Sequence, residues 1–213
     1  MSGINDDPAS PRERILRAAH DVFVELGALA SLDQVVDRAD VDTDTFDRLF
    51  PGRDSLIKAV VVHNMTQLST HARAARKDQR DPWTAFRHFA YAIVEDRVVA
   101  LLITLGSHAR RDEQFVNARS EVGDELGLLL AAARKAGLRG DVDVGDIVLY
   151  LSVITRPNLA VPAGLDARAR ARLLDVMLDG LRADGSTPLA GEPITEEDVD
   201  TTLMTAHWHR RAL

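Results

Sequence analysis

Residues 31–50 read SLDQVVDRADVDTDTFDRLF. Ser31 and Asp42 are residue types that cap helix N-termini, and apolar residues follow each of them at helical spacing. Asp40-Val41 separates the two runs, and Pro51-Gly52 ends the second. The stretch therefore predicts two short helices joined by a tight turn. That is the outline of a helix-turn-helix, whose second helix lies in the major groove of DNA.

A third helix is predicted before this pair, from Pro11 to about Leu26, with Gly27 at its end. The polar residues 1–10 are expected to form a disordered arm. The three helices make an N-terminal module over residues 11–52, which is small for a core of its own. A longer helix, from Arg53 to about Lys77, is expected to pack its first apolar residues against this module.

The remaining chain also shows only helical patterns. Helices are predicted at 83–105, 112–136, 146–155 and 166–182, followed by a linker over 184–194 and a short helix from Thr195 to about Arg211. No strand pattern and no internal repeat is visible. The fold class is therefore all-α, with a three-helix helix-turn-helix module (residues 11–52), a larger helical domain (residues 53–185) and a C-terminal tail (residues 186–213).

Composition limits the function classes. The chain carries a net charge of −7, is 46% hydrophobic and 28% charged, and has no cysteine. It has neither an apolar run of membrane length nor the start of a signal peptide, so a cytoplasmic protein without a membrane span is expected. Between residues 12 and 58, ten acidic residues face seven basic ones. Charge alone would therefore not predict nucleic-acid binding.

The spacing of the apolar and capping residues nevertheless resembles the TetR/AcrR family of one-component transcriptional regulators. The resemblance reaches to about residue 185. The matching residues are Ile15, Ala18, Ala19, Phe23, Gly27, Ser31, Val35, Ala39, Val41, Thr45, Phe46, Phe50, Arg53 and Leu56. The resemblance implies a ligand-responsive homodimeric regulator, most simply a repressor, with residues 53–185 as its ligand-binding and dimerisation domain.

The DNA-contacting residues follow from helix-turn-helix docking and from the resemblance. Arg48 can donate to guanine or phosphate, and a threonine can contact a phosphate or a thymine methyl. Asp47 stands where the family usually has a phosphate-binding Tyr, and Asp40 stands where it usually has Gly. The predicted contacts are Ser31, Thr43, Thr45, Asp47, Arg48, Arg53 and Arg14. The expected partner is a palindromic operator in double-stranded DNA.

The acidic second helix leaves two readings open. In the first, the module binds a specific operator. In the second, the chain is a degenerate family member with weak or no DNA binding, acting as a ligand- or protein-binding module. Asp47 is the residue that separates them, because a carboxylate repels the phosphate backbone.

The resemblance also implies a small-molecule ligand inside the helical body. An apolar pocket with a few polar groups is the usual form of such a site. The candidate lining residues are His63, Met65, Trp83, Phe86, Phe89, Tyr91, His108, Phe115 and Tyr150. The alternative is that these residues are ordinary core. With 5% aromatic residues, a small or aliphatic ligand is favoured over a broad aromatic one.

The helices predicted at 146–155 and 166–182 are too apolar to be exposed. Two such helices from each subunit would form a four-helix bundle, and the resemblance implies the same homodimer. The predicted interface residues are Ile147, Tyr150, Leu151, Leu173, Leu174, Met177 and Leu178. The alternative is burial within one chain.

An enzyme is not predicted. The seven histidines are scattered without metal-binding spacing, and no glycine-rich phosphate loop or nucleophile motif is present. The sequence therefore predicts neither a metal site nor a cofactor.

Overall fold

The computed structural model describes residues 10–27, 29–77, 81–109, 112–158 and 160–199. Within these residues the named elements are all helices, and the one β-type pairing is an isolated bridge between Leu138 and Arg182. The helices are α1 (Pro11–Leu26), α2 (Leu32–Ala39), α3 (Thr43–Leu49), α4 (Arg53–Lys77), α5 (Pro82–Glu95), α6 (Leu102–Ala109), α7 (Glu113–Lys135), α8 (Val144–Ile154) and α9 (Ala163–Gly180). Among them, none is long and apolar enough to cross a membrane.

Side-chain caps fix where the first three helices begin. The Ser10 hydroxyl accepts from the Glu13 N–H, and the Glu13 carboxylate accepts from the Ser10 N–H, which makes a complete capping box at α1. Ser31 forms the same box at the start of α2 with Gln34. Asp42 caps α3 by accepting from the Thr45 N–H at 2.7 Å. The helix starts predicted from these local patterns are confirmed.

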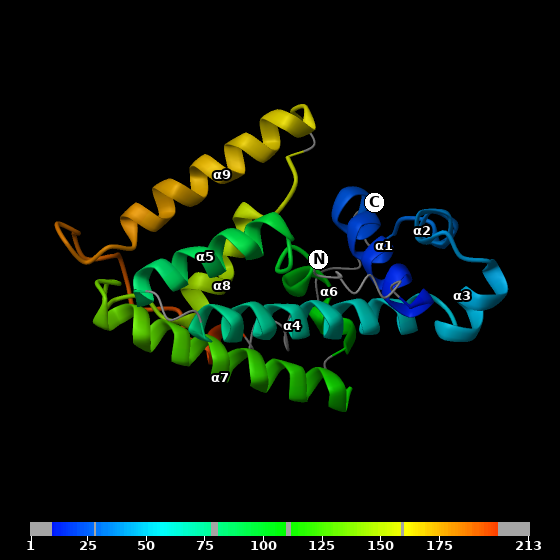
Figure 1. Ribbon diagram of the computed structural model, residues 1–213, viewed down its shortest axis with the longest axis horizontal. Coiled ribbons are helices and arrows are strands. Elements are labelled where there is room, and N and C mark those ends of the chain that lie inside the picture. The colour runs from blue at the N-terminus through cyan, green and yellow to red at the C-terminus, as the bar shows by residue number, and fades with distance from the viewer. Residues whose placement is uncertain (1–9, 28, 78–80, 110–111, 159, 200–213) are drawn as a thin grey trace, which may run out of the picture.

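Helices α1–α3 form a head at one end of α4, and α4 continues from the head along the whole body (Figure 1). The head buries Phe23, Phe46 and Phe50 almost completely, and the rings of Phe46 and Phe50 lie 6.2 Å apart. The Arg12 guanidinium lies 4.9 Å from the Phe50 ring centroid on the outside. This small aromatic core holds α3 against α1 while leaving one face of α3 exposed.

The body is built on α4 and α7, which lie side by side (Figure 1). Arg73 on α4 forms ion pairs with Glu121 and Glu125 on α7, and Arg76 also pairs with Glu125. Beneath these pairs the apolar faces of both helices are buried, including Leu68 and Leu126. Helices α5, α6 and α8 complete the core, and α9 lies against α5 and α8 at the edge.

The single helix predicted over residues 83–105 is wrong. Helix α5 ends at Glu95, residues 96–101 form turns, and α6 then runs through Gly106 to Ala109. Arg97 in this break has a left-handed backbone, with φ of +51°. The apolar run at 98–105 is hydrophobic on every side, so a continuous helix would leave part of it in water. The turns allow Val98, Val99 and Leu101 all to be buried.

The C-terminal part of the chain agrees with its prediction in part. Helix α9 begins at Ala163, directly after Pro162, and so a few residues earlier than expected. Residues 196–199 are helical, but most of the predicted helix to Arg211 lies outside the described residues, as do residues 1–9 of the predicted arm.

Asp40 closes α2 in the left-handed conformation, with φ of 51° and ψ of 56°. An L-residue with a side chain is strained there, whereas glycine is not. We therefore expect Asp40→Gly to raise the free energy of unfolding by about 0.5–1 kcal/mol. Urea denaturation measures this change. The matched control is Asp37→Gly, inside α2, which should lower stability by about 1 kcal/mol. If both variants lowered the free energy of unfolding, the backbone of Asp40 would not be strained.

Candidate functional site

The exposed face of α3 is the first candidate surface. Thr43, Asp44, Asp47 and Arg48 are exposed, and Thr45 is half-buried. Thr43 and Asp47 are four residues apart, as are Asp44 and Arg48, so all four share one broad face of the helix. Hydrogen bonds from the Thr45 N–H and hydroxyl lower the pKa of the Asp42 carboxyl at the cap. The surface therefore presents the Arg48 guanidinium, the hydroxyl of the exposed Thr43 and several carboxylates.

Four of the predicted DNA contacts, Thr45, Arg48, Ser31 and Arg14, already have hydrogen-bond partners in the head. Thr45 donates its hydroxyl to Asp42 and accepts from Arg48 at 3.5 Å. The Ser31 hydroxyl accepts from the Asp33 N–H at 3.2 Å as part of its cap. Arg14 donates from Nε to the Ala39 carbonyl and from Nη2 to the Asp40 carbonyl, both at 3.1 Å. Arg14 thus holds the turn between α2 and α3, a role that no local pattern signals.

Arg53, another predicted DNA contact, is the first residue of α4 and is half-buried beside the head. The structure therefore brings Arg48 and Thr43 to the outer surface of α3, and places Ser31, Arg14 and Arg53 at the helix ends around it. The carboxylates of Asp44 and Asp47 lie on the same surface as Arg48.

A wide polar cleft separates the head from the body. Its volume is about 790 Å³, and it lies between α1, α4 and the turns after α5. The lining residues are Glu13, Arg17, His20, Asp21, Val24, Glu25, His63, Asn64, Gln67, Glu95, Asp96, Arg97 and Val98. His63 was predicted to line a ligand pocket, but it lies here, apart from the aromatic residues of the body.

A side-chain hydrogen bond joins α1 to α4 at this cleft. His20 Nδ1 on α1 donates to Asn64 Oδ1 on α4 at 3.2 Å. Asn64 is 2% exposed, although it sits in the apolar face of α4. Burial lowers the pKa of His20, and the opposing effects of Asp21, Asn64 and the Asp96 backbone only partly offset it. Sequence reasoning missed this pair. The polar Asn64 among the apolar residues of α4 was the available signal.

A second, apolar cavity of about 50 Å³ lies inside the body. It is lined from α4, α6, α7, α8 and the tail by Met65, Leu68, Leu102, Arg119, Val122, Gly123, Val144, Gly145, Val148, Glu196 and Val199. Of the predicted pocket residues, only Met65 lines it. Leu68 and the valines of α7 and α8 could not be distinguished from other core residues by sequence.

The predicted aromatic pocket residues lie elsewhere in the body. Phe86, Phe89 and Phe115 are fully buried in the core. Trp83 is half-buried at the start of α5, with its ring 5.7 Å from that of Phe86 and 4.7 Å from the Arg182 guanidinium. Tyr150 is half-buried and donates to Asp146 at 3.4 Å. Tyr91 is also half-buried. His108 belongs to α6, but its side chain lies outside the described residues.

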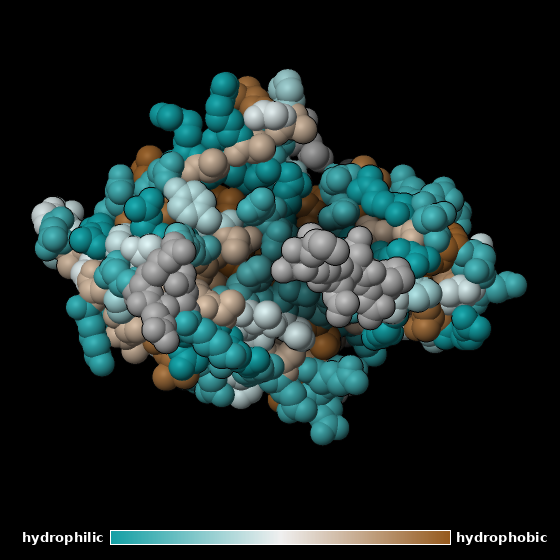
Figure 2. Space-filling model, in the orientation of Figure 1, coloured by the Kyte–Doolittle hydropathy of each residue, from teal (hydrophilic) through white to brown (hydrophobic). Residues whose placement is uncertain are grey.

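The predicted interface residues divide into two groups. Ile147, Leu151, Leu174 and Leu178 are buried within the chain, and Tyr150 and Met177 are half-buried. Leu173, in contrast, is 51% exposed, and so are Val176 on α9 (69%) and Val153 on α8 (62%). Figure 2 shows hydrophobic surface along α9 among hydrophilic atoms. An apolar face on α8 and α9 therefore remains uncovered in the single chain.

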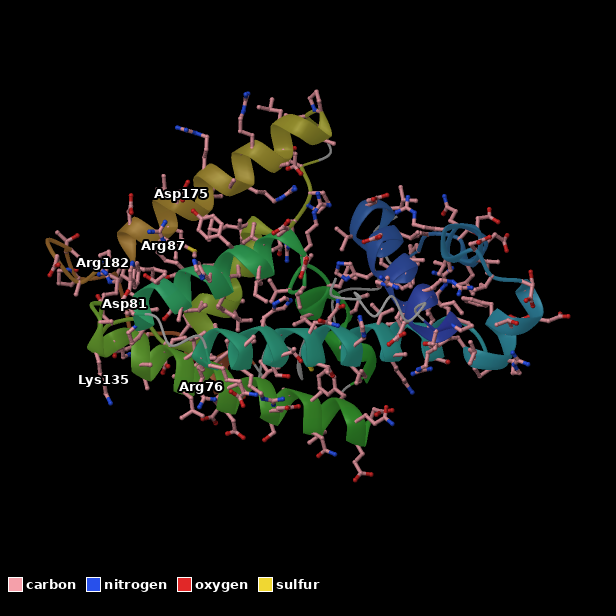
Figure 3. All side chains as sticks on the ribbon, in the orientation of Figure 1. Arg76, Asp81, Arg87, Lys135, Asp175 and Arg182 are labelled. Atoms are coloured by element: carbon pink, nitrogen blue, oxygen red, sulfur yellow. The ribbon has the colours of Figure 1, made fainter. Side chains whose placement is uncertain are left out.

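Polar contacts hold the other face of α9 to the body. Tyr91 on α5 donates its hydroxyl to the Asp175 carboxylate on α9. Figure 3 shows Arg87 on α5 and Asp175 on the facing sides of the two helices. Arg182 lies near Asp81 at the far end of the same pair (Figure 3). Among the described residues, no group of three or more histidines and carboxylates is arranged to hold a metal ion.

Comparison with known proteins extends this description. Residues 81–183 match the family described as transcriptional regulator SbtR-like, C-terminal domain. No curated protein matches the chain.

Solved structures of TetR regulators are similar over most of the chain. The TetR transcriptional regulator SCO0520 from Streptomyces coelicolor is 26% identical, with a TM-score of 0.60 over 82% of this chain and 99% of that one. A TetR regulatory protein from Mycobacterium vanbaalenii is 28% identical, with a TM-score of 0.52 over 81% and 95%. LfrR from Mycobacterium smegmatis, in complex with proflavine, shares the fold at 18% identity, with a TM-score of 0.63 over 84% and 97%.

The burial of His20 predicts a pH dependence of stability. Because the folded pKa of His20 lies below its unfolded value of about 6.5, the unfolded chain binds more protons as the pH falls below that value. The free energy of unfolding should therefore be highest above pH 7 and should decrease as the pH is lowered. In His20→Gln this decrease should be smaller, although not absent, since burial also lowers the pKa of His63. Urea unfolding at pH 7.5 and pH 5.5 measures it, with exposed His88→Gln as the control. An unchanged pH dependence in His20→Gln would contradict this role.

Proposed function

We propose that the chain, which is similar to TetR-family transcriptional regulators over most of its length, is a homodimeric repressor whose DNA binding is released by a small apolar ligand. The observation that carries this proposal is the position of α4. Asn64 on α4 bonds to His20 in the head, and the next residue, Met65, lines the apolar cavity of the body. A change in the cavity therefore acts one residue away from a contact that orients the head.

DNA binding is proposed for the exposed face of α3. Arg48 and Thr43 are the residues that reach bases or phosphates from this face, and Arg53 and Ser31 lie at helix N-termini where phosphates bind. Asp44 and Asp47 weaken the contact with the phosphate backbone. Specificity then depends on base contacts, of which an aspartate accepting from cytosine is one. Binding should be weak on unrelated DNA and sensitive to salt.

The ligand is proposed to enter the apolar cavity of the body. Its walls are aliphatic apart from Arg119 and Glu196, which favours a small apolar molecule over a charged one. A ligand larger than the cavity shifts α4 and α7 apart. The conformation that binds the ligand more tightly then has a different head orientation, and its population rises with ligand concentration.

Homodimerisation is proposed through the exposed apolar face of α8 and α9. Leu173, Val176 and Val153 lie on this face, and the second copy would bury them in a four-helix bundle. A two-fold dimer presents two copies of α3 to a palindromic operator, with half-sites one or more helical turns apart. The spacing of the heads then decides whether both fit the same DNA.

A second candidate function is a ligand- or protein-binding module that no longer binds an operator. The exposed carboxylates of Asp44 and Asp47 favour it. Titration of labelled duplexes separates the two functions. The protein is added to its own upstream region and to an unrelated duplex, at low and at physiological salt. Tight binding to the upstream region alone supports the repressor, and equal weak binding that salt abolishes supports the second candidate.

Two substitutions on α3 test whether this helix touches DNA. We expect Asp47→Tyr to raise affinity for all duplexes, because a repulsive charge is removed from the phosphate backbone. Arg48→Ala should weaken operator binding by about 1–3 kcal/mol if Arg48 reads a base. Fluorescence anisotropy measures both. Asp179→Tyr on α9 makes the same charge change far from the head and is the control. If neither α3 variant changed the affinity for DNA, the exposed face of α3 would be excluded as the DNA-binding surface.

A charge on the exposed face of α9 tests the dimer. Val176→Glu should convert the dimer to a monomer, because a carboxylate in a dry interface lacks a partner and costs several kcal/mol. Analytical ultracentrifugation measures the mass. Leu128→Glu, on α7, changes a residue of similar exposure (52%) and should leave the dimer intact. A dimeric Val176→Glu protein would place the interface elsewhere.

A further inference from the structure

Residues 186–199 form a segment that we call the C-terminal strap. The strap lies beyond residues 81–183, which the family profile matches. Its first half is held by Arg139, which is 6% exposed in the loop after α7. The Arg139 guanidinium donates to the Thr187 carbonyl at 2.6 Å and to the Asp141 carboxylate at 2.5 and 2.8 Å. Asp141 in turn accepts from the Leu189 N–H at 2.9 Å.

This first anchor is electrostatic. Hydrogen bonds from Arg139 and from the Leu189 N–H hold the pKa of the Asp141 carboxyl far below its ordinary value. Hydrogen bonds that involve a charged group are roughly twice as strong as neutral ones. The strap therefore begins at a fixed point, although its composition of Gly, Ser and Pro is typical of a linker.

The second anchor is Asp146 in the first turn of α8. Its carboxylate accepts from the Asp143 N–H at 2.8 Å, as part of the helix cap, and from the Ile194 N–H at 3.1 Å. The Asp146 N–H donates to the Ile194 carbonyl, also at 3.1 Å. One residue of the strap thus makes a two-way pairing with one residue of α8, and both backbone groups of Ile194 are satisfied.

Two glycines make room for the strap. A Cβ atom on Gly145 of α8 would lie 2.3 Å from the Thr195 carbonyl oxygen and 2.5 Å from that of Ile194. A Cβ atom on Gly123 of α7 would lie 2.4 Å from both carboxylate oxygens of Glu196. Glycine inside a helix costs about 1 kcal/mol relative to alanine. At both positions, glycine allows the strap to approach the helix closely, although it makes the helix itself less stable.

The strap forms one wall of the apolar cavity. Glu196 and Val199 line it opposite Met65 and Leu68 of α4. With the strap in place, the volume is about 50 Å³, whereas ligand pockets commonly reach about 300–1,000 Å³. A ligand of ordinary size therefore does not fit until a wall moves. The strap is the wall that belongs to no helix of the bundle.

We propose that the C-terminal strap is a gate, which closes the apolar cavity between α4, α7 and α8 and lifts from Gly123 and Gly145 to admit a small apolar ligand. This inference rests on the proposed ligand response. Lifting the strap breaks the Ile194 pairing with Asp146 and removes Glu196 and Val199 from the wall. The anchor at Arg139 is further from the cavity and holds the start of the strap while its end moves.

The experiment uses the full-length chain and N-phenyl-1-naphthylamine, an uncharged apolar dye whose fluorescence rises in an apolar site. Gly145→Ala forces the strap backbone away from α8. We expect the Gly145→Ala protein to bind the dye about ten times faster and about ten times more tightly than the wild type. Both changes follow if the population of the open form rises by the same factor. Amide hydrogen exchange at Ile194 reports strap opening without any ligand, whereas exchange at Leu189, whose N–H is held by the first anchor, should stay unchanged. Gly164→Ala on α9 is the matched control, because its Cβ atom would have open space.

A second set of variants keeps the test independent of the folding of Gly145→Ala. Gly123→Ala should open the strap less than Gly145→Ala does, since its methyl group meets only the end of the flexible Glu196 side chain. Adding Glu196→Ala to Gly123→Ala removes the clash and should return exchange and dye binding towards the wild-type values. Gly127→Ala on the same helix, where a Cβ atom has open space, should change neither.

The outcomes are distinct. Faster amide exchange at Ile194 with unchanged dye binding would overturn the gate, and so would dye binding by none of the proteins. Dye binding that follows strap opening supports the gate. If the dye then leaves the affinity for the upstream duplex unchanged, the ligand response of the proposed function fails while the gate stands.

Discussion

The burial of one face of α4 along its full length is the constraint on which the other elements depend. The helix begins beside the head, meets α1 through His20 and Asn64, and carries Met65 and Leu68 to the cavity before it pairs with α7. A rigid helix that contacts both parts cannot be moved at one end alone. The fold therefore joins the head to the body through one continuous helix, with the polar cleft beside α1 between them.

The head shows a conflict between folding and electrostatics. Asp42 begins α3, and Asp44 lies in its first turn, where the helix dipole favours a negative charge. Arg14 and Arg12, which would add positive charge near DNA, bond to the turn after α2 and lie over Phe50. The same residues that make a short three-helix head stable thus reduce its attraction for a polyanion. Asp47 lies beyond the first turn of α3 and caps no helix, so neither effect accounts for its charge.

The sequence predicted the features that depend on residues close together in the chain, and missed those that depend on distant contacts. The starts of α2 and α3 followed from the caps Ser31 and Asp42, and the end of α1 followed from Gly27, all of which act within four residues. The break at 96–101 was hidden because the run at 98–105 is apolar on every side. The role of Arg14 depends on a turn 25 residues away. Among the aromatic residues predicted to line a ligand pocket, Phe86, Phe89 and Phe115 lie in the core, whereas the cavity between α4, α7 and α8 is lined mainly by aliphatic residues. Gly123 and Gly127 look alike in sequence, but only the first meets the strap.

The place of the strap in the chain has a consequence for biosynthesis. Domains fold during translation from their N-terminus. Helices α4, α7 and α8 therefore leave the ribosome before the segment that covers the cavity between them, and Gly123 and Gly145 face water until residues 194–199 arrive. If the strap is the gate that we propose, the nascent chain carries an open cavity until residues 194–199 dock.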